Sequence, residues 1–202
     1  MTSNFLLSRL SLPALSVLGA VAGGCGPDTI LNVDGRVSSV RGEMLGLDES
    51  VDSGPCTARV VYRRMAGDAA DVDETFGRYQ LDSRNALLIE VNGHRITGSG
   101  MTQLETWNTT GDNFHVADGV GVPQIGIEAP DLAPMRVDGK DDNKMQFRLH
   151  FIDDTGKIVD DDRPPSPFPY TKPRQWRLFD LTRNKASITC EIRGVDSFER
   201  DN

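Results

Sequence analysis

The chain has 202 residues, of which 38% are hydrophobic and 26% charged, and its formal net charge is −8. This length and composition, with 20 Gly and 11 Pro to supply turns, fit one soluble domain with its own core rather than a disordered chain. The acidic surplus repels phosphate groups, which argues against nucleic acid as a partner and against binding of anionic lipid through the domain face.

The first 24 residues differ from the rest of the chain. Arg9 is their one charged residue, and an apolar stretch follows it from Leu10 to Ala22. Ser, Pro and Gly interrupt this stretch, which falls short of the roughly 20 apolar residues that a membrane-spanning helix needs. Such an arrangement is typical of a secretory signal peptide. Without it the chain keeps 21 of its 22 basic residues and all 30 acidic ones, a net charge of −9.

The apolar stretch ends in Ala22-Gly23-Gly24-Cys25. Small residues directly before a cysteine resemble the lipobox of bacterial lipoproteins, where the signal is cut before the cysteine and that residue is lipidated. The resemblance implies that residues 1–24 are removed and that Cys25 carries acyl chains such as palmitate in the cell envelope. An Asp after the cysteine commonly retains such proteins at the inner membrane, so Gly26 implies the outer membrane. The alternative is an ordinary signal that leaves Cys25 as a plain thiol.

The number of cysteines bears on this choice. Three is an odd number, which leaves one thiol over in an exported protein. If Cys25 carries lipid, Cys56 and Cys190 remain, each on the apolar face of a predicted strand. An oxidising compartment favours a disulfide between them, which the chain-entropy model values at about 5 kcal/mol for so long a loop. Two buried unpaired thiols are the alternative.

Residues 25–29 are predicted to form a short tether and residues 30–202 a single β-rich domain. Strands are predicted where apolar and polar residues alternate with a period of two. The clearest runs are 56–63, 145–151 and 188–193, with inward sets of Cys56, Ala58, Val60 and Tyr62, then Met145, Phe147, Leu149 and Phe151, then Ile188, Cys190 and Ile192. Weaker strands are predicted at 30–40, 78–81, 104–107, 114–116, 122–127, 157–159 and 175–181, and one short helix at 65–75.

A hairpin is predicted between Ala86 and Thr97, because Asn92-Gly93 favours a two-residue type I′ turn. That turn pairs Val91 with His94, Glu90 with Arg95 and Ile89 with Ile96. Many short antiparallel strands separated by turns predict an all-β fold, either an antiparallel β-sandwich or an open barrel. The prediction includes one interstrand disulfide and at most one short helix.

Acidic runs are the sharpest polar feature of the chain. Asp138, Asp141 and Asp142 form one run, and Asp153 and Asp154 form another. Calcium takes six to eight oxygen ligands, so these residues are calcium candidates, although their spacing fits no EF-hand and solvated loops are the plainer interpretation. No cofactor and no other metal site is predicted.

Aromatic and histidine residues offer further candidates. Trp107, Trp176 and Tyr170 would suit a sugar-stacking surface, although aromatic residues on strands more often belong to the core. The proline-rich stretch 163–169 is an extended connection or a docking segment. His94, His115 and His150 are interpreted as structural or solvated.

Motifs for catalysis are missing, and Gly98-Ser99-Gly100 lacks the full nucleophile-elbow pattern. The leading hypothesis is therefore a membrane-anchored envelope lipoprotein with a non-catalytic β-sandwich domain for binding or assembly, with a protein partner in the envelope. One alternative is a hydrolase of an envelope polymer with a loop-built site. The other is a carbohydrate- or calcium-binding module.

Overall fold

The computed structural model describes residues 27–50, 54–63, 75–108, 112–120, 133–153, 163–165 and 176–200. Their one helical element is a 3-10 turn, η1 (Arg84–Ala86), and all strand pairings are antiparallel, which confirms the all-β prediction. The strands are β1 (Asp28–Arg41), β2 (Pro55–Arg63), β3 (Phe76–Leu81), β4 (Leu87–Val91), β5 (His94–Thr97), β6 (Thr102–Trp107), β7 (Asp112–Gly119), β8 (Met135–Val137), β9 (Lys140–Asp142), β10 (Met145–Asp153), β11 (Trp176–Arg183) and β12 (Ala186–Arg200).

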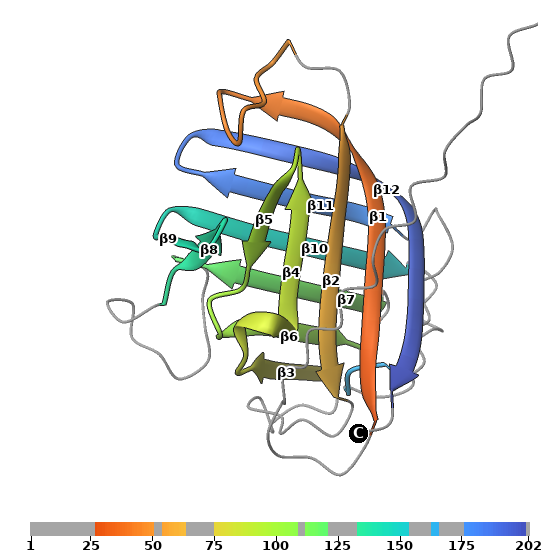
Figure 1. The fold of residues 1–202 in the computed structure, drawn as a ribbon. Helices are drawn as coiled ribbons and strands as arrows, with labels where there is room; N and C mark the ends of the chain where they lie inside the picture. Colours follow the sequence, from red (N-terminus) through yellow and green to blue (C-terminus); the bar gives the residue numbers. More distant parts are fainter. Residues whose placement is uncertain are drawn as a thin grey trace, which may run out of the picture.

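These strands form one sheet in the order β3-β6-β7-β10-β11-β12-β1-β2-β4-β5-β8-β9, which curls over on itself (Figure 1). The curl depends on β1 and β12, which pair from Asp28↔Arg200 to Arg41↔Ser187. We call β2, β4 and β5, with the start of β1 and the end of β12, layer I. Layer II comprises β3, β6, β7, β10 and β11, with the start of β12 and the end of β1. Figure 1 shows the strands of layer I running upright and those of layer II running across them.

The two layers share a corner because β1 bends. Its pairing with β12 shifts register between Asp34 and Gly35 and again between Val37 and Ser39. Bulges of this kind bend a strand and increase its twist, so β1 passes from one layer into the other. Long strands that change layer at a bulge are the usual corners of sandwiches whose layers cross.

The core lies between the layers and contains all of the predicted inward sets. Every residue of those sets on β2, β10 and β12 is buried. Tyr62 of layer I meets Phe114 of layer II with ring centroids 5.7 Å apart. Its hydroxyl donates a hydrogen bond of 2.7 Å to the Pro165 carbonyl. Burial, and then the charge of Glu199, raise the pKa of the Tyr62 hydroxyl, so the group remains a donor.

The predicted hairpin is confirmed residue by residue, with Val91↔His94, Glu90↔Arg95 and Ile89↔Ile96 paired in β4 and β5. Ala86 differs, because it belongs to η1 rather than to the strand. β1 starts at Asp28, two residues before the predicted position. The predicted strands at 122–127 and 157–159, and the predicted helix apart from Thr75, lie outside the described residues.

Candidate functional site

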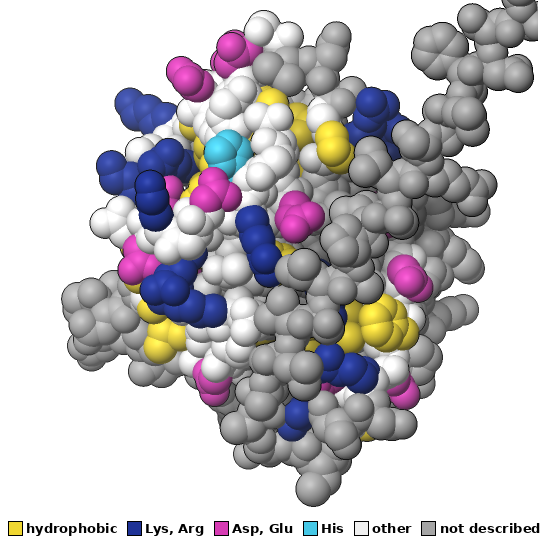
Figure 2. Space-filling view, in the orientation of Figure 1, with side chains coloured by type: hydrophobic (Ala, Val, Ile, Leu, Met, Phe, Trp, Pro, Cys, Tyr) yellow, Lys and Arg dark blue, Asp and Glu magenta, His cyan; other side chains and the backbone are white. Residues whose placement is uncertain are grey.

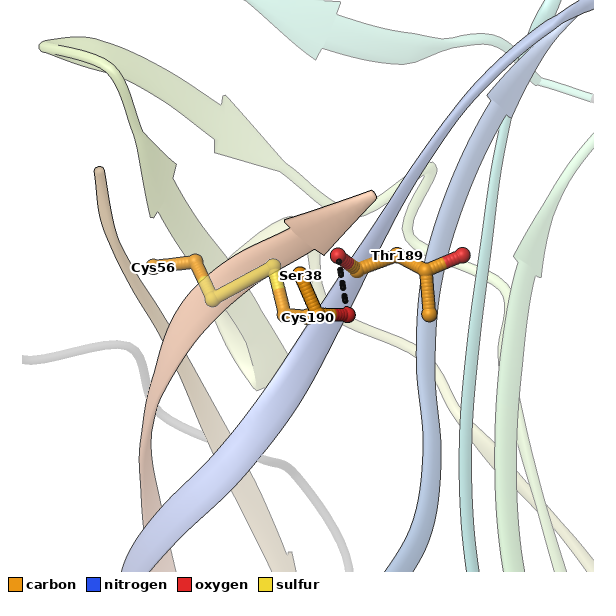
Figure 3. The surroundings of a disulfide bond; sticks show 4 residues. All are labelled: Ser38, Cys56, Thr189 and Cys190. Carbon is orange, nitrogen blue, oxygen red and sulfur yellow. Dashed lines mark hydrogen bonds between the residues drawn. A yellow bond between two sulfur atoms is a disulfide. The ribbon is translucent and has the colours of Figure 1, made fainter. Parts of the chain in front are cut away.

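The predicted cysteine pair forms a disulfide at the corner of the sheet. Cys56 on β2 and Cys190 on β12 have Cα atoms 6.6 Å apart. Because β1 lies between those two strands, the bond crosses it, as Figure 3 shows. The facing residues on β1 are Gly35 and Val37. Both cysteines are buried in the core cluster, so the bond ties together the two strands on either side of the bend.

Gly35 leaves the space that this crossing requires. A Cβ at that position would lie 2.7 Å from the Glu191 carbonyl oxygen and 3.1 Å from the Cys56 sulfur. Nearby, the Ser38 hydroxyl donates to the Thr189 carbonyl at 3.1 Å, which holds β1 to β12 at the second bulge (Figure 3).

The beginning of β1 is fixed by a buried ion pair. Cys25 lies outside the described residues, and Asp28, three positions later, is 1% exposed. Its carboxylate accepts hydrogen bonds from Arg63 at 2.5 Å and from Arg200 at 3.1 Å. Because β2 ends at Arg63 and β12 ends at Arg200, this carboxylate joins three strand ends. Phe198, which is 46% exposed, borders a hollow of about 280 Å³ nearby.

The acidic run at 138–142 is used in ion pairs of the β8–β9 hairpin and its neighbours. Asp138 accepts from the Arg95 backbone N–H at 2.8 Å and lies 2.7 Å from His94 Nδ1. Asp141 pairs with Arg136 at 2.7 Å, and Asp142 pairs with Arg183 at 3.0 Å. Of the other candidates, Asp153 ends β10 with its side chain outside the described residues, where Asp154 also lies. Within the described ranges, no three His, Cys, Asp or Glu side chains are placed to hold a metal ion.

The Gly98-Ser99-Gly100 turn is held by a buried carboxylate. Asp118 accepts from the Ser99 N–H at 3.1 Å, from the Thr102 hydroxyl at 2.5 Å and from the Gly119 N–H at 2.6 Å. The Ser99 hydroxyl oxygen accepts from the Met101 N–H at 3.0 Å, and the residue is buried. This serine therefore stabilises the turn.

Layer II carries a row of polar side chains on its outer face. Strand pairing places Arg78 opposite Glu105, Glu105 opposite His115, and His115 opposite His150, on β3, β6, β7 and β10. These residues alternate with buried neighbours such as Tyr79, so they point away from the core. We call Arg78, Gln103, Glu105, His115 and His150 the polar row, since Gln103 lies two residues from Glu105 on the same face of β6.

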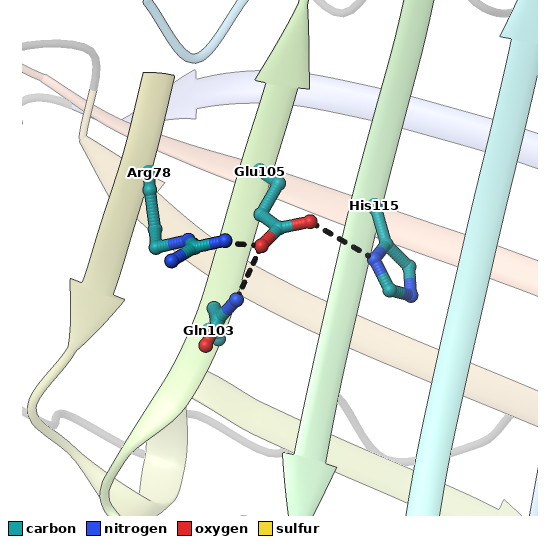
Figure 4. A network of polar contacts seen from close by, with 4 residues as sticks. All are labelled: Arg78, Gln103, Glu105 and His115. Atoms are coloured by element: carbon teal, nitrogen blue, oxygen red, sulfur yellow. Dashed lines mark hydrogen bonds and ion pairs between the residues drawn. The ribbon is translucent and has the colours of Figure 1, made fainter. Parts of the chain in front are cut away.

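Glu105 is the centre of this row, as Figure 4 shows. Its carboxylate accepts hydrogen bonds from Arg78 at 3.0 Å and Gln103 at 2.5 Å, and it faces His115 Nδ1 at 3.5 Å. Burial by itself raises the pKa of Glu105. The hydrogen bond from His115 and the charge of Arg78 outweigh burial, so the pKa lies below the usual glutamate value. The carboxylate is therefore ionised at neutral pH.

The two histidines of the row are in ring contact. The His115 and His150 rings have centroids 5.2 Å apart and an interplanar angle of 48°. Figure 4 shows Nδ1 of His115 directed at Glu105 and the other ring nitrogen directed away from it. A neutral His115 that donates from Nδ1 to the carboxylate keeps Nε2 as a hydrogen-bond acceptor at the surface.

An aromatic pair borders the polar row. Trp107 and Phe76 are paired across β6 and β3, with ring centroids 4.3 Å apart at an interplanar angle of 50°. The Arg78 guanidinium lies 5.2 Å from the Phe76 ring centroid. Trp107 is 39% exposed. Of the other predicted sugar-stacking residues, Tyr170 and the Trp176 side chain lie outside the described residues.

The sequence prediction singled out Trp107, His115 and His150 but missed Arg78, Gln103 and Glu105. His150 lies between Leu149 and Phe151 of the predicted inward set and is half-buried, which agrees with the predicted alternation. The missed signal is the alternation in 102–107, where Gln103, Glu105 and Trp107 share the face opposite Leu104. It could be detected only once that strand is extended to Thr102.

Other surfaces offer less. On the described part of layer I, basic and acidic side chains are interspersed over the visible face (Figure 2). No helix in the described ranges has the length and apolar character of a membrane span.

Comparisons with protein-family models, curated proteins and solved structures gave no match. The outer face of layer II therefore remains the best-defined candidate site, on the strength of its own geometry.

Proposed function

We propose that this chain is an envelope lipoprotein, anchored through lipid on Cys25, whose β-sandwich is a non-catalytic binding module. Outer-membrane attachment is part of the proposal, because Gly26 follows the cysteine. The binding surface is the outer face of layer II, which carries the polar row and the exposed Trp107.

The observation that carries the proposal is the pair of buried ion pairs that Asp28 forms with Arg63 and Arg200, which we call the Asp28 clamp. Three residues span at most about 10 Å, so a lipid on Cys25 would hold the Asp28 end of the sandwich close to the bilayer surface. Arg63 and Arg200 fix that end to β2 and β12. The disulfide supports the same assignment, because it leaves Cys25 as the one cysteine without a partner in the chain.

A binding role accounts for the polar row better than catalysis does. Glu105 is the one carboxylate of the row. Arg78, Gln103 and His115 already surround it as hydrogen-bonding partners. None of the described residues paired with His115 across β6 and β10 is a serine, threonine or cysteine. A histidine without a neighbouring nucleophile positions a ligand more readily than it drives acyl transfer.

Metabolic labelling tests the anchor. The full chain is expressed in a bacterium fed an alkyne analogue of palmitate, beside the Cys25→Ser variant. We expect label on the wild-type chain, none on the variant, and release of the variant from the membrane fraction. An unlabelled wild-type chain, or a Cys25→Ser chain that stays equally membrane-bound, would overturn the proposal.

The Gly26→Asp variant tests the membrane assignment separately. Inner and outer membranes are separated on a density gradient and the protein is detected in each. We expect the wild-type chain in the outer membrane and Gly26→Asp in the inner membrane, with both chains equally labelled. Equal distribution of the two would contradict the outer-membrane part of the proposal and leave lipidation intact.

A further inference from the structure

We propose that the outer face of layer II binds a neutral glycan chain, with Trp107 as the stacking surface and the polar row as its hydrogen-bonding edge. This inference rests on the proposed binding function and names the ligand class for it. It draws on four observations: a supported exposed indole, hydrogen-bonding groups beside it, an unpartnered amide oxygen, and the negative charge of the face and of the chain.

The first step is the indole. Large exposed apolar side chains are limited, among the described residues, to Trp107 and Phe198. Phe76 packs against Trp107, and Arg78 lies over Phe76, so the indole is held from the side by its neighbours on the sheet. An aromatic ring held in this way stacks on an apolar surface at small cost in side-chain entropy. One face of a pyranose ring, made of C–H bonds, is such a surface.

The second step is the polar row that runs beside the indole. Trp107 and Glu105 are two residues apart on β6, which is about 7 Å along a strand. A sugar ring stacked on the indole therefore presents its rim of hydroxyls toward the row. Each hydroxyl both donates and accepts. The row offers acceptors at Glu105 and His115 Nε2, which suit the hydroxyl donors of a sugar.

The third step is the amide of Gln103. Its Nε2 donates to Glu105, and its Oε1 is buried without a hydrogen-bond partner among the described residues. The residue is 5% exposed. An unmet buried acceptor costs about 1–3 kcal/mol. A donor supplied by a bound hydroxyl, with a small shift of the amide, would remove this cost. Gln103 thus points to a ligand with hydroxyl donors.

The fourth step is charge, which separates a neutral glycan from an anionic ligand. The Glu105 carboxylate is ionised, because its pKa lies below the usual value, and Arg78 is already paired with it. The chain without its first 24 residues has a net charge of −9. The Glu105 carboxylate and the net negative charge of the chain would repel a phosphate or a polyanionic polymer. Neither of them repels a neutral sugar.

The test uses the native lipoprotein in a zwitterionic detergent, because alkyl glycoside detergents would compete for the site. Cellohexaose, chitohexaose, maltohexaose and laminarihexaose are titrated by calorimetry up to millimolar concentration, and tryptophan fluorescence is recorded in parallel. We expect binding of at least one of them with a change in the emission of Trp107. Failure of all four to bind would overturn the inference.

Variants assign the binding to this face. Trp107→Ala is expected to weaken binding at least tenfold, whereas Trp107→Phe keeps a stacking ring and loses only the fluorescence change. Phe198→Ala, which removes the other large exposed apolar side chain of the described residues, is the matched control and should bind as the wild type does. Equal affinity of Trp107→Ala and the wild type would refute the site.

The outcome is independent of the anchor. A labelled lipoprotein that binds no glycan keeps the proposed anchoring and loses this inference. An unlabelled chain that binds glycan through Trp107 keeps this inference and loses the proposed anchoring.

Discussion

At the scale of single residues, Glu105 shows how a carboxylate can be ionised while largely covered. Its side chain is 12% exposed and is surrounded by Arg78, Gln103 and His115. Burial penalises the charged form, and the donors more than compensate for this penalty. The result is a fixed negative charge on an outer sheet face.

This charge predicts a pH dependence of stability. The pKa of Glu105 is lower in the folded than in the unfolded chain, so the unfolded chain binds more protons between the two values. Stability from this group is therefore present at neutral pH and is lost as the pH falls below the ordinary glutamate pKa and through the folded pKa. Glu105→Gln should lower the free energy of unfolding by about 1–3 kcal/mol at pH 7. Urea unfolding should show this difference shrinking in acid.

Glu191→Gln is the matched control, because its pair with Arg193 is exposed on both sides. Exposed pairs of this kind contribute about 0–1 kcal/mol. If the two variants behave alike at every pH, Glu105 has no special role in stability.

Asp118 gives a second prediction at this scale. Its buried carboxylate receives only donors, from Ser99, Thr102 and Gly119. Asp118→Asn places an N–H₂ group among those donors and should cost about 1–3 kcal/mol. Thr102→Val removes one donor and should cost less. Chemical unfolding gives both values, and amide exchange at Ser99 and Gly119 should accelerate in Asp118→Asn. Unchanged amide exchange in Asp118→Asn would contradict the role of Asp118 in holding this turn.

At the scale of elements, the corner of β1 depends on Gly35. A methyl group there would approach both the Glu191 carbonyl and the disulfide. Gly35→Ala should therefore lower stability by about 1–3 kcal/mol through crowding. Thermal unfolding under oxidising conditions measures the effect, and a thiol assay reports whether the disulfide still forms. Gly54→Ala, where a Cβ would meet nothing within 4 Å, is the control and should unfold as the wild type does.

Elements whose signals are local were predicted well. The β4–β5 hairpin has its predicted register because Asn92-Gly93 fixes the turn, with Asn92 and Gly93 both at positive φ. The β8–β9 hairpin was missed although Asp138-Gly139 is an equivalent turn, also at positive φ. Its strands have three residues each, too few for alternation to be recognised, and its aspartates were interpreted as calcium candidates.

The polar row could not be predicted because it depends on pairing between distant strands. Glu105 and His115 meet in the β6–β7 hairpin, which is a local arrangement. His150 joins them only because β10 pairs with β7, and β11 occupies the other edge of β10. Alternation within 145–151 predicts which face of β10 is buried, but it gives no sign of which strands occupy its two edges.

At the scale of the whole molecule, the disulfide closes a loop with a sequence separation of 134 residues. The chain-entropy model gives about 5 kcal/mol for its contribution. The Cys56→Ala/Cys190→Ala double variant should lose stability of this order in urea unfolding. Wild-type protein unfolded with reductant present should match the double variant. A double variant as stable as the oxidised wild type would show that the bond constrains the unfolded chain very little.

The full-length pairing of β1 with β12 also sets when folding can finish. β1, the first described strand, pairs with β2 and also with β12, the last. The corner and the Asp28 ion pairs require β12 together with β1, and the disulfide requires β12 together with β2. A chain emerging from a ribosome or a translocation channel therefore cannot close its sandwich until residue 200 has been released. Until then the polypeptide stays unfolded, which is the state that the proposed export across a membrane would require.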